Sequence, residues 1–378
     1  MSAFTDDVQH ERVGGLGCIT LNRPKALNAL SLAMVRELTR LLLIWRDDPS
    51  VRVVAIRGSN KEGAFGAFCA GGDIRYFHQA ALTGDPGLED FFTEEYSLNH
   101  LIAQYPKPYI AFMDGIVMGG GMGLSQGARL RIVTERTQMA MPETQIGLFP
   151  DVGGGYFLSR CPGHVGEYLA LTGQLLRGAE PLAVGLADVF MPSAELPQLW
   201  NDLVVHSTMN GDAFLQWLRG RCEAFTQAVR STVPTWLDNH LDAVFALPSV
   251  QDMAGALQTL SAQQPQSWAD QTLQALRQRS PLMLHVALEQ VRRGRDMALA
   301  DDLRMERDLV RHCFFTTHLE RRGSSSETVE GIRALAVDKD RTPKWQPARI
   351  EDVTADMVLP FFASPWPAHA HPLRGLQG

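Results

Sequence analysis

The most constraining feature of this sequence is a change of pattern close to residue 195. Before that point, short β-rich runs alternate with glycine turns and amphipathic helical segments. The β-rich runs are residues 17–21, 51–57, 109–113 and 130–134. After that point the pattern is almost wholly helical. Because strands that alternate with helices are typical of α/β domains, we expect an α/β domain over residues 1–196 and a helical region over residues 197–378.

Two of the expected helices have a clear apolar face. Residues 31–45 form the first, and Ser31 suits its N-cap. Its shared apolar face comprises Met34, Leu38, Leu41, Leu42 and Trp45. Residues 298–314 form the second, with arginine and aspartate residues opposite an apolar stripe. That stripe comprises Leu299, Leu303, Val310, Cys313 and Phe314.

Composition and charge exclude several classes of protein. The chain has 378 residues, of which 45% are hydrophobic and 20% charged, so it needs neither disulfides nor metal to build a core. A formal net charge of −7 argues against nucleic-acid binding, and no apolar run approaches the roughly 20 residues that span a bilayer. Residues 1–12 are too acidic and polar for a targeting peptide. The five scattered cysteines indicate reduced, partly buried thiols, and we expect a cytoplasmic protein.

Three glycine clusters punctuate the first half, at residues 68–73 (FCAGGD), 118–123 (MGGGMG) and 153–155 (GGG). Taken singly, each indicates only a tight turn, because glycine readily adopts positive φ. The first two lack the spacing of a dinucleotide fingerprint, and no Gly-Lys-Ser/Thr follows for a phosphate loop. If these two clusters converge, however, their unpaired N–H groups at helix N-termini form an oxyanion hole.

Two carboxylates, Glu143 and Asp151, lie in the apolar segment MPETQIGLFPDV. Either one alone indicates a helix cap or a solvated loop residue. Two of them among so many apolar neighbours are expected to be partly desolvated. Desolvation and mutual repulsion raise at least one carboxyl pKa, which acid/base catalysis at neutral pH requires. The histidines are scattered, so no metal site is expected.

Taken in order, these motifs resemble the crotonase (enoyl-CoA hydratase/isomerase) superfamily. The segments that carry the resemblance are residues 21–30 (LNRPKALNAL), 68–73, 118–121, 171–173 (LTG) and 185–188 (GLAD). Within that superfamily the sequence is most similar to the 3-hydroxyisobutyryl-CoA hydrolases. The segments that match them are residues 92–96 (FTEEY), 142–155, 330–334 (EGIRA) and 338–345 (DKDRTPKW). The resemblance covers nearly the whole chain.

The resemblance implies a spiral of repeated ββα units followed by a mostly helical C-terminal region. It also implies coenzyme A as part of the substrate, with no separate cofactor. The family's oxyanion donors correspond to the backbone N–H groups of Gly72 and Gly120. The residues that match CoA-binding positions are Lys25, Ala26, Leu27, Ala70, Gly71, Gly72 and Ile74. The residues that match acyl-contacting positions are Glu95, Gly120, Glu143 and Asp151, with Glu94 as the alternative to Glu95.

One departure from the family pattern favours a hydrolase. Hydratases carry a second glutamate where this sequence has Gly123, and typical hydratases have glycine where it has Asp151. The resemblance therefore implies cleavage of 3-hydroxyisobutyryl-CoA, or a close β-hydroxyacyl-CoA, in valine breakdown. Glu143 either attacks the thioester carbonyl or activates water. Asp151 binds the substrate hydroxyl, orients water or protonates the leaving thiolate.

Two other functions stay open on the sequence alone. An enoyl-CoA hydratase or isomerase is one, because an isomerase needs only Glu143 to move a proton. A non-catalytic CoA-binding protein is the other, although intact acids and glycine clusters weigh against it. The expected partner is a small acyl-CoA molecule, with neither nucleic acid nor membrane. Superfamily relatives often form trimers, so a homo-oligomer is also considered.

Overall fold

The computed structural model describes residues 6–231, 234–237 and 240–377, and its contacts divide the chain into two compact units. The first unit comprises Met1–Gly72, Ser97–Ala140 and Leu175–Pro234. The second unit comprises Asp73–Tyr96, Met141–Gln174 and Thr235–Gly378. The units therefore interleave along the chain, whereas the sequence suggested one boundary after residue 196. The division into domains 1–196 and 197–378 stays a prediction.

A largely parallel sheet forms the centre of the first unit, with the strand order β1-β2-β3-β5-β7-β10 and β4 paired to β3. The strands are β1 (Val8–Val13), β2 (Leu16–Leu21), β3 (Val53–Asn60), β4 (Gly63–Ala64), β5 (Tyr109–Met113), β7 (Leu130–Val133) and β10 (Val189–Phe190). The four β-rich runs of the sequence correspond to β2, β3, β5 and β7, so this prediction is confirmed. All four are buried over most of their length because both faces of a parallel sheet are covered.

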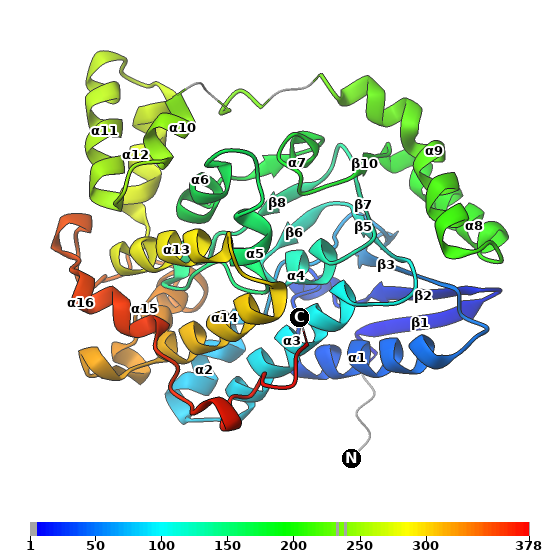
Figure 1. The fold of residues 1–378 in the computed structure, drawn as a ribbon, viewed down its shortest axis with the longest axis horizontal. Helices are drawn as coiled ribbons and strands as arrows, with labels where there is room; N and C mark the ends of the chain where they lie inside the picture. The colour runs from blue at the N-terminus through cyan, green and yellow to red at the C-terminus, as the bar shows by residue number, and fades with distance from the viewer. Residues whose placement is uncertain (1–5, 232–233, 238–239, 378) are drawn as a thin grey trace. The chain divides into compact units, whose positions relative to one another are not determined.

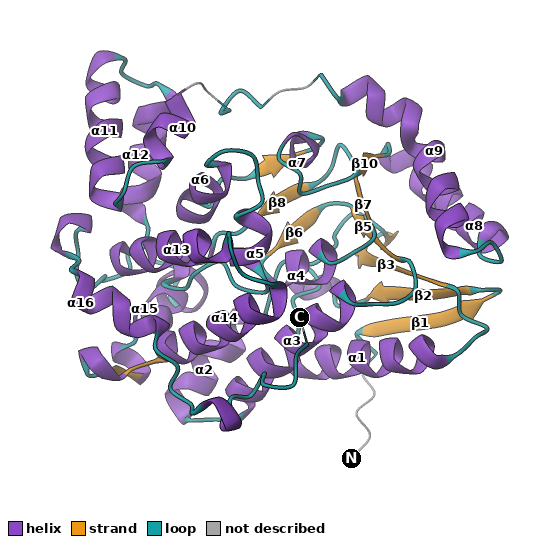
Figure 2. Cartoon of the chain, viewed as in Figure 1, coloured by secondary structure: helices purple, strands orange, loops and turns teal. Residues whose placement is uncertain are grey.

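A smaller sheet in the same unit contains β6 (Ile116–Met118), β8 (Gln138–Ala140) and β9 (Leu176–Arg177), in the order β6-β8-β9. Along the chain, β1-β2 leads to α1, β3-β4 to α2, and β5-β6 to α4. This repetition is the ββα order that the resemblance implied (Figures 1 and 2). The helices of the first unit are α1 (Leu32–Asp47), α4 (Gly120–Gln126), α7 (Glu180–Ala183), α8 (Leu196–His206) and α9 (Gly211–Val229).

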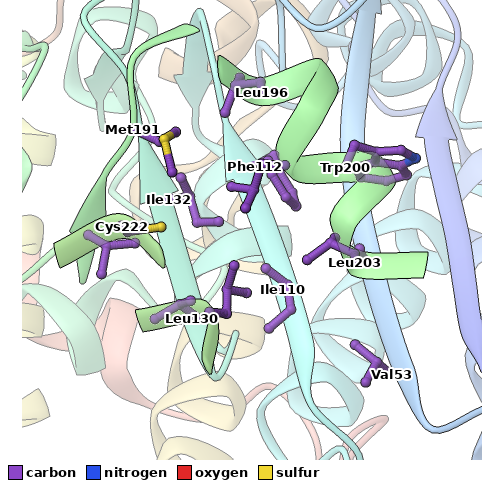
Figure 3. Packing of buried hydrophobic residues seen from close by; sticks show 14 of the residues in the cluster. Val53, Ile110, Phe112, Leu130, Ile132, Met191, Leu196, Trp200, Leu203 and Cys222 are labelled. Atoms are coloured by element: carbon purple, nitrogen blue, oxygen red, sulfur yellow. The ribbon is translucent and has the colours of Figure 1, made fainter. Parts of the chain in front are cut away.

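The core of the first unit lies between the main sheet and the helices α8 and α9. Phe112 and Ile132 of the strands pack with Trp200 of α8 and Cys222 of α9 (Figure 3). The rings of Phe112 and Trp200 meet edge to face at 5.3 Å between centroids. Aromatic and β-branched side chains on alternating strand positions thus bury α8 and α9 against the sheet.

The helix expected over residues 31–45 is confirmed as α1. The Ser31 side chain accepts a hydrogen bond from Met34 N, which satisfies one unpaired donor of the first turn. Every residue of its expected apolar face is buried. Local capping and helical periodicity were sufficient to define this element.

The second unit is mainly helical. Its helices are α2 (Ile74–Thr83), α5 (Gly154–Leu158), α6 (Val165–Thr172), α10 (His240–Phe245), α11 (Val250–Gln263), α12 (Trp268–Gln278), α13 (Pro281–Gly294), α14 (Leu299–Phe314), α15 (Glu327–Ile332) and α16 (Ala355–Val358). A short ribbon pairs β11 (Phe315–Thr316) with β12 (Arg321–Arg322). Helix α3 (Gly87–Ala103) begins in the second unit and ends in the first.

Helix α14 differs from the amphipathic helix that its sequence indicated. Most of its apolar stripe is buried, although Leu299 is only half-buried. Its opposite face is buried as well, including Asp302, Glu306 and Arg307. The reason is that these charged groups have polar partners inside the second unit, so the charged face does not need solvent.

The five cysteines are all buried, and none forms a disulfide within the described residues. The thiols were expected to be partly buried, and the structure buries all five more fully than that. Among the helices described by the structure, none is long and apolar enough to cross a membrane.

Candidate active site

The first two glycine clusters lie side by side in the first unit. Met118 N donates to the Cys69 carbonyl at 3.0 Å, and Cys69 N donates to the Ile116 carbonyl at 2.9 Å. A side-chain carbon built on Gly71 would lie 3.7 Å from the backbone nitrogen of Gly120. The two clusters therefore converge, which is the condition that the sequence set for an oxyanion hole. The use of the Gly72 and Gly120 amides as oxyanion donors stays a prediction.

Gly120 is the first residue of α4, so its N–H belongs to the turn whose donors lack intrahelical acceptors. The preceding Gly119 has φ of 46°, a conformation that glycine adopts at little cost. Any side chain on Gly121 would meet the Cys69 carbonyl oxygen at 2.4 Å. Glycine is thus required where α4 approaches the loop that contains Cys69. The first N–H groups of α4 lie next to that loop.

The loop predicted to bind CoA joins the same cluster. Ala70 N donates to the Leu27 carbonyl at 3.0 Å, and Leu30 N donates to the Gly71 carbonyl at 2.8 Å. Lys25 is exposed, and so is Leu27, with 46% of its surface accessible. Leu27 also has a positive φ, which is uncommon for leucine. Residues 25–27 and 70–72 are therefore brought together within the first unit, with accessible side chains at the tip of the loop.

Ile74, also matched to CoA binding, begins α2 in the second unit and follows the N-cap residue Asp73. Asn28 holds the loop at residues 25–27 from inside and was not singled out from the sequence. Its Nδ2 donates to the Ser59 and Ala67 carbonyls, both at 2.9 Å. Its presence in the motif LNRPKALNAL was the available signal.

Three carboxylates gather in the interior of the second unit. Glu95 is 2% exposed on α3, Glu143 is 6% exposed at the start of a short 3-10 turn (Glu143–Ile146), and Asp151 is 5% exposed before α5. Glu94 is only half-buried, so Glu95 is the acid that faces inward. The expected burial of Glu143 and Asp151 is confirmed.

Burial raises the pKa of all three carboxyls. It raises the pKa of Asp151 to about 6. Burial, followed by the charge of Asp151, raises the pKa of Glu143 well above its usual value. Burial and the charges of Asp151 and Glu143 do the same for Glu95. Because each negative charge disfavours the next, the three groups do not all ionise near neutral pH, and the cluster can hold and release protons there.

Tyr96 completes this cluster and was missed as a functional residue. Its hydroxyl donates to Asp151 Oδ2 at 2.8 Å, and the side chain is fully buried. This hydrogen bond favours the ionised form of Asp151 and opposes the effect of burial on its pKa. The segment FTEEY contained Tyr96, but a helical sequence does not reveal a partner 55 residues away.

The backbone around Glu143 and Asp151 is closely constrained. Gly147 ends the 3-10 turn at φ of 68°, and a side chain there would meet the Glu327 carbonyl oxygen at 2.4 Å. Val152 has φ of 58°, which is strained for a β-branched residue. Strained backbone concentrates at functional sites, where the surrounding structure holds it in place.

Two buried carboxylate oxygens, Glu95 Oε1 and Glu143 Oε2, have no hydrogen-bond partner within the described residues. Buried polar atoms are normally paired, so these oxygens are suited to a hydroxyl or a water molecule. Gly123 lies buried in α4, where a second hydratase glutamate would stand. Among the described residues, no group of three or more metal-ligating side chains could hold a metal ion, and the absence of a metal stays a prediction.

Comparisons with known proteins assign the chain to one family. Residues 16–362 match the enoyl-CoA hydratase/isomerase family. The chain is 40% identical over 353 residues to "3-hydroxyisobutyryl-CoA hydrolase, mitochondrial" of Gallus gallus, covering 93% of this chain and 87% of that one. It is also 40% identical over 364 residues to "3-hydroxyisobutyryl-CoA hydrolase 1" of Arabidopsis thaliana, covering 95% and 92%.

Two solved structures share the fold over nearly the whole chain. An enoyl-CoA hydratase from Rhodobacter sphaeroides 2.4.1 superposes with a TM-score of 0.81 at 35% identity, covering 95% of this chain and 98% of that one. A carnitinyl-CoA dehydratase from Mycobacterium thermoresistibile gives the same TM-score at 34% identity, covering 99% and 100%.

Proposed function

Because the chain belongs to the enoyl-CoA hydratase/isomerase family, we propose that it hydrolyses the thioester of 3-hydroxyisobutyryl-CoA, or of a close β-hydroxyacyl-CoA, to the free acid and CoA. The observation that carries this proposal is the buried carboxylate pair Glu143 and Asp151, with Tyr96 bonded to Asp151. Relatives at about 40% identity carry the hydrolase name.

In this reaction water adds to the thioester carbonyl, the C–S bond breaks, and the thiolate takes up a proton. The backbone N–H groups of Gly72 and Gly120 bind the thioester oxygen and stabilise the negative charge that develops on it. The loss of one such donor typically raises the barrier by roughly 3–4 kcal/mol. Lys25, Leu27 and the neighbouring residues 70–72 hold the CoA portion.

Glu143 carries the central role, either as the nucleophile that forms a mixed anhydride or as the base that activates water. Its unpaired, buried Oε2 supports both roles, because neither requires the atom to leave an existing partner. Asp151 binds the substrate hydroxyl, orients water or protonates the leaving thiolate. A pKa of about 6 allows Asp151 both to hold and to give up a proton near neutral pH.

The second candidate is a hydratase, because both superposed structures carry hydratase or dehydratase titles. Against it, Gly123 offers no carboxylate to pair with Glu143. We also propose that this hydrolysis belongs to valine breakdown, as the family resemblance implies. The names of several relatives include "mitochondrial", so the cytoplasmic location predicted for this chain differs from theirs. A homo-oligomer is the remaining proposal, and light scattering on a sizing column tests it.

A parallel assay separates the two reactions. We expect rapid release of CoA thiol from 3-hydroxyisobutyryl-CoA and slow loss of the enoyl absorbance of crotonyl-CoA. We also expect roughly tenfold or greater preference for the hydroxylated acyl group, because a buried acid left without its partner costs on the order of 1–3 kcal/mol. Rapid hydration without thiol release would establish the hydratase, and slow release from every thioester with tight CoA binding would indicate a non-catalytic protein.

A further inference from the structure

The buried polar face of α14 is aimed at the turn that carries Asp151. Helices α5, α13 and α14 lie side by side in the second unit (Figure 1). Glu306 of α14 and Gln290 of α13 are both fully buried there. A carboxylate in such a position carries a high desolvation cost, which hydrogen bonds to it reduce.

Glu306 binds the backbone immediately after Asp151. Its Oε2 accepts a hydrogen bond from Gly153 N at 2.7 Å, and its Oε1 accepts one from Gly155 N at 3.0 Å. Burial and the neighbouring charge of Asp302 raise the pKa of Glu306, and these two amide hydrogen bonds oppose that rise. Both N–H groups lie at the start of α5, where Gly153 has no side chain of its own to serve as a cap.

Gln290 binds the backbone immediately before Asp151. Its Nε2 donates to the Pro150 carbonyl at 2.6 Å and to Glu306 Oε1 at 2.9 Å. The hydrogen-bonded pair Glu306 and Gln290 therefore binds the backbone on both sides of Asp151 and Val152. Neither Glu306 nor Gln290 was singled out from the sequence, because each lies more than 130 residues from the turn.

The backbone between these two anchor points is strained. Val152 has φ of 58°, which a β-branched residue rarely adopts, and Gly153 follows at 90°. Such a conformation persists only where the surrounding structure over-determines it. Helix α13 also packs closely against this turn, because a side-chain carbon on Gly294 would lie 2.3 Å from the Gly155 carbonyl oxygen.

We propose that Glu306 is a positioning residue of the hydrolysis proposed above, which holds the strained turn through the Gly153 and Gly155 amides and thereby sets the direction of the Asp151 side chain. Gln290 assists from the other side by holding the Pro150 carbonyl. The inference rests on the proposed function. It adds that Asp151 reaches its working position only when the backbone on both of its sides is held by this carboxylate and amide.

The test uses Glu306→Gln, in which one amide oxygen replaces two carboxylate acceptors and the new NH₂ group faces a backbone N–H. We expect kcat for thioester hydrolysis to fall at least tenfold while KM changes less than about twofold, because CoA is bound elsewhere. Asp308→Asn is the matched control. Asp308 is another buried carboxyl of α14, but it contacts Ser364 and His371 in the C-terminal segment, so kcat should stay within about twofold of wild type.

Two further measurements separate positioning from a loss of stability. In an Asp151→Asn background, Glu306→Gln should cause no additional loss, because Glu306 acts through Asp151. Amide hydrogen exchange over residues 152–155 should become faster in Glu306→Gln and stay unchanged in Asp308→Asn. If Glu306→Gln does not fold, Gln290→Met replaces it in the test. This variant removes the hydrogen bond to the Pro150 carbonyl without changing a charge, and it should show the same loss of kcat at constant KM.

The outcomes are distinguishable. An active wild-type enzyme whose Glu306→Gln variant keeps more than half of kcat overturns the positioning role and leaves the proposed function intact. The same conclusion follows if the fold-loss of kcat in the double variant equals the product of the losses in Glu306→Gln and Asp151→Asn. A wild-type protein that releases no thiol overturns the proposed function and this inference with it.

Discussion

At the scale of single residues, burial gives the carboxyl groups of the second unit their chemistry. An exposed aspartate is ionised throughout the physiological range, whereas burial raises the pKa of Asp151 to about 6. The hydrogen bond from Tyr96 opposes this effect of burial, and the charge of Asp151 in turn raises the pKa of Glu95. Substitutions at these positions should therefore change rates and pH profiles more than they change binding.

Glu143→Gln should reduce kcat to less than a tenth of the wild-type value while CoA-thioester binding survives. The amide keeps the shape of the side chain but has no basic oxygen to attack or to accept a proton. Thiol release gives kcat, and calorimetric titration with a substrate thioester gives the binding constant. Retention of more than a tenth of kcat, a loss below about 1.4 kcal/mol, would exclude Glu143 as nucleophile or main base. Glu37→Gln, which alters a buried glutamate on α1, is the control and should leave kcat unchanged.

Tyr96→Phe should move one limb of the pH profile of kcat/KM to higher pH. The hydroxyl donates to Asp151 Oδ2 and favours the carboxylate, so its removal raises the pKa of Asp151 further above 6. If Asp151 works as a base, activity near pH 6.5 falls, whereas if it works as an acid, activity extends to higher pH. Tyr105→Phe removes a buried hydroxyl bonded to the Leu42 carbonyl and should not shift the limb. A limb that stays in place or moves to lower pH in Tyr96→Phe would contradict this role of the hydroxyl.

At the scale of elements, one helix N-terminus in each unit leaves backbone N–H groups without intrahelical acceptors. Helix α4 begins with glycines at the point where it approaches the loop at residues 68–72, and α5 begins with glycines that Glu306 binds. In both places the absence of side chains lets another group reach backbone N–H groups that the helix itself leaves unpaired.

Gly120→Pro should lower kcat by roughly a hundredfold or more, because proline has no N–H to donate to the oxyanion. Gly120 is the first residue of α4, a position where proline suits helix geometry, so the fold should tolerate the change. Gly120→Ala keeps the N–H and serves as the matched variant, with a melting curve recorded for both. Equal kcat values for wild type and a folded Gly120→Pro variant would rule out a catalytic role for this amide.

At the scale of the whole molecule, the buried acids make stability depend on pH. Burial raises the pKa of Asp302 and of Glu327 each to about 7, so the folded protein holds protons there that the unfolded chain has released. Stability contributed in this way is fully present below pH 4 and is lost as pH rises through about 7. The pKa values of His285, His312 and His371 are lowered by burial, so these side chains oppose this trend until the unfolded imidazoles, with pKa values of about 6.5, have lost their protons at about pH 7.5.

Between pH 6.5 and 8, we therefore expect each of these two carboxyls to lower the free energy of unfolding by on the order of 1 kcal/mol. Urea unfolding at several pH values measures this dependence. Glu327→Gln carries no titrating group at that position, and its stability should fall less over the same interval. Equal changes in the free energy of unfolding of the wild type and of Glu327→Gln over this interval would disprove the expectation.

The sequence by itself determined the features that depend on neighbouring residues. The hydrophobic period located the strands β2, β3, β5 and β7, and helical spacing with Ser31 defined α1. The apolar surroundings of Glu143 and Asp151 were sufficient to predict their burial, because close neighbours along the chain also lie close in space. The ordered motifs likewise carried the family resemblance.

Only the tertiary structure decided which distant residues share one interior. Tyr96 reaches Asp151, and Glu306 reaches Gly153, through helices whose own sequences show no sign of these partners. The charged face of α14 looks like a solvated face in the sequence, and packing turned it into a buried one. The two compact units interleave for the same reason, since they form wherever segments bury apolar surface together, regardless of chain order. Periodicity records which side of a helix is apolar, but the partner of a buried charge depends on how the helices pack.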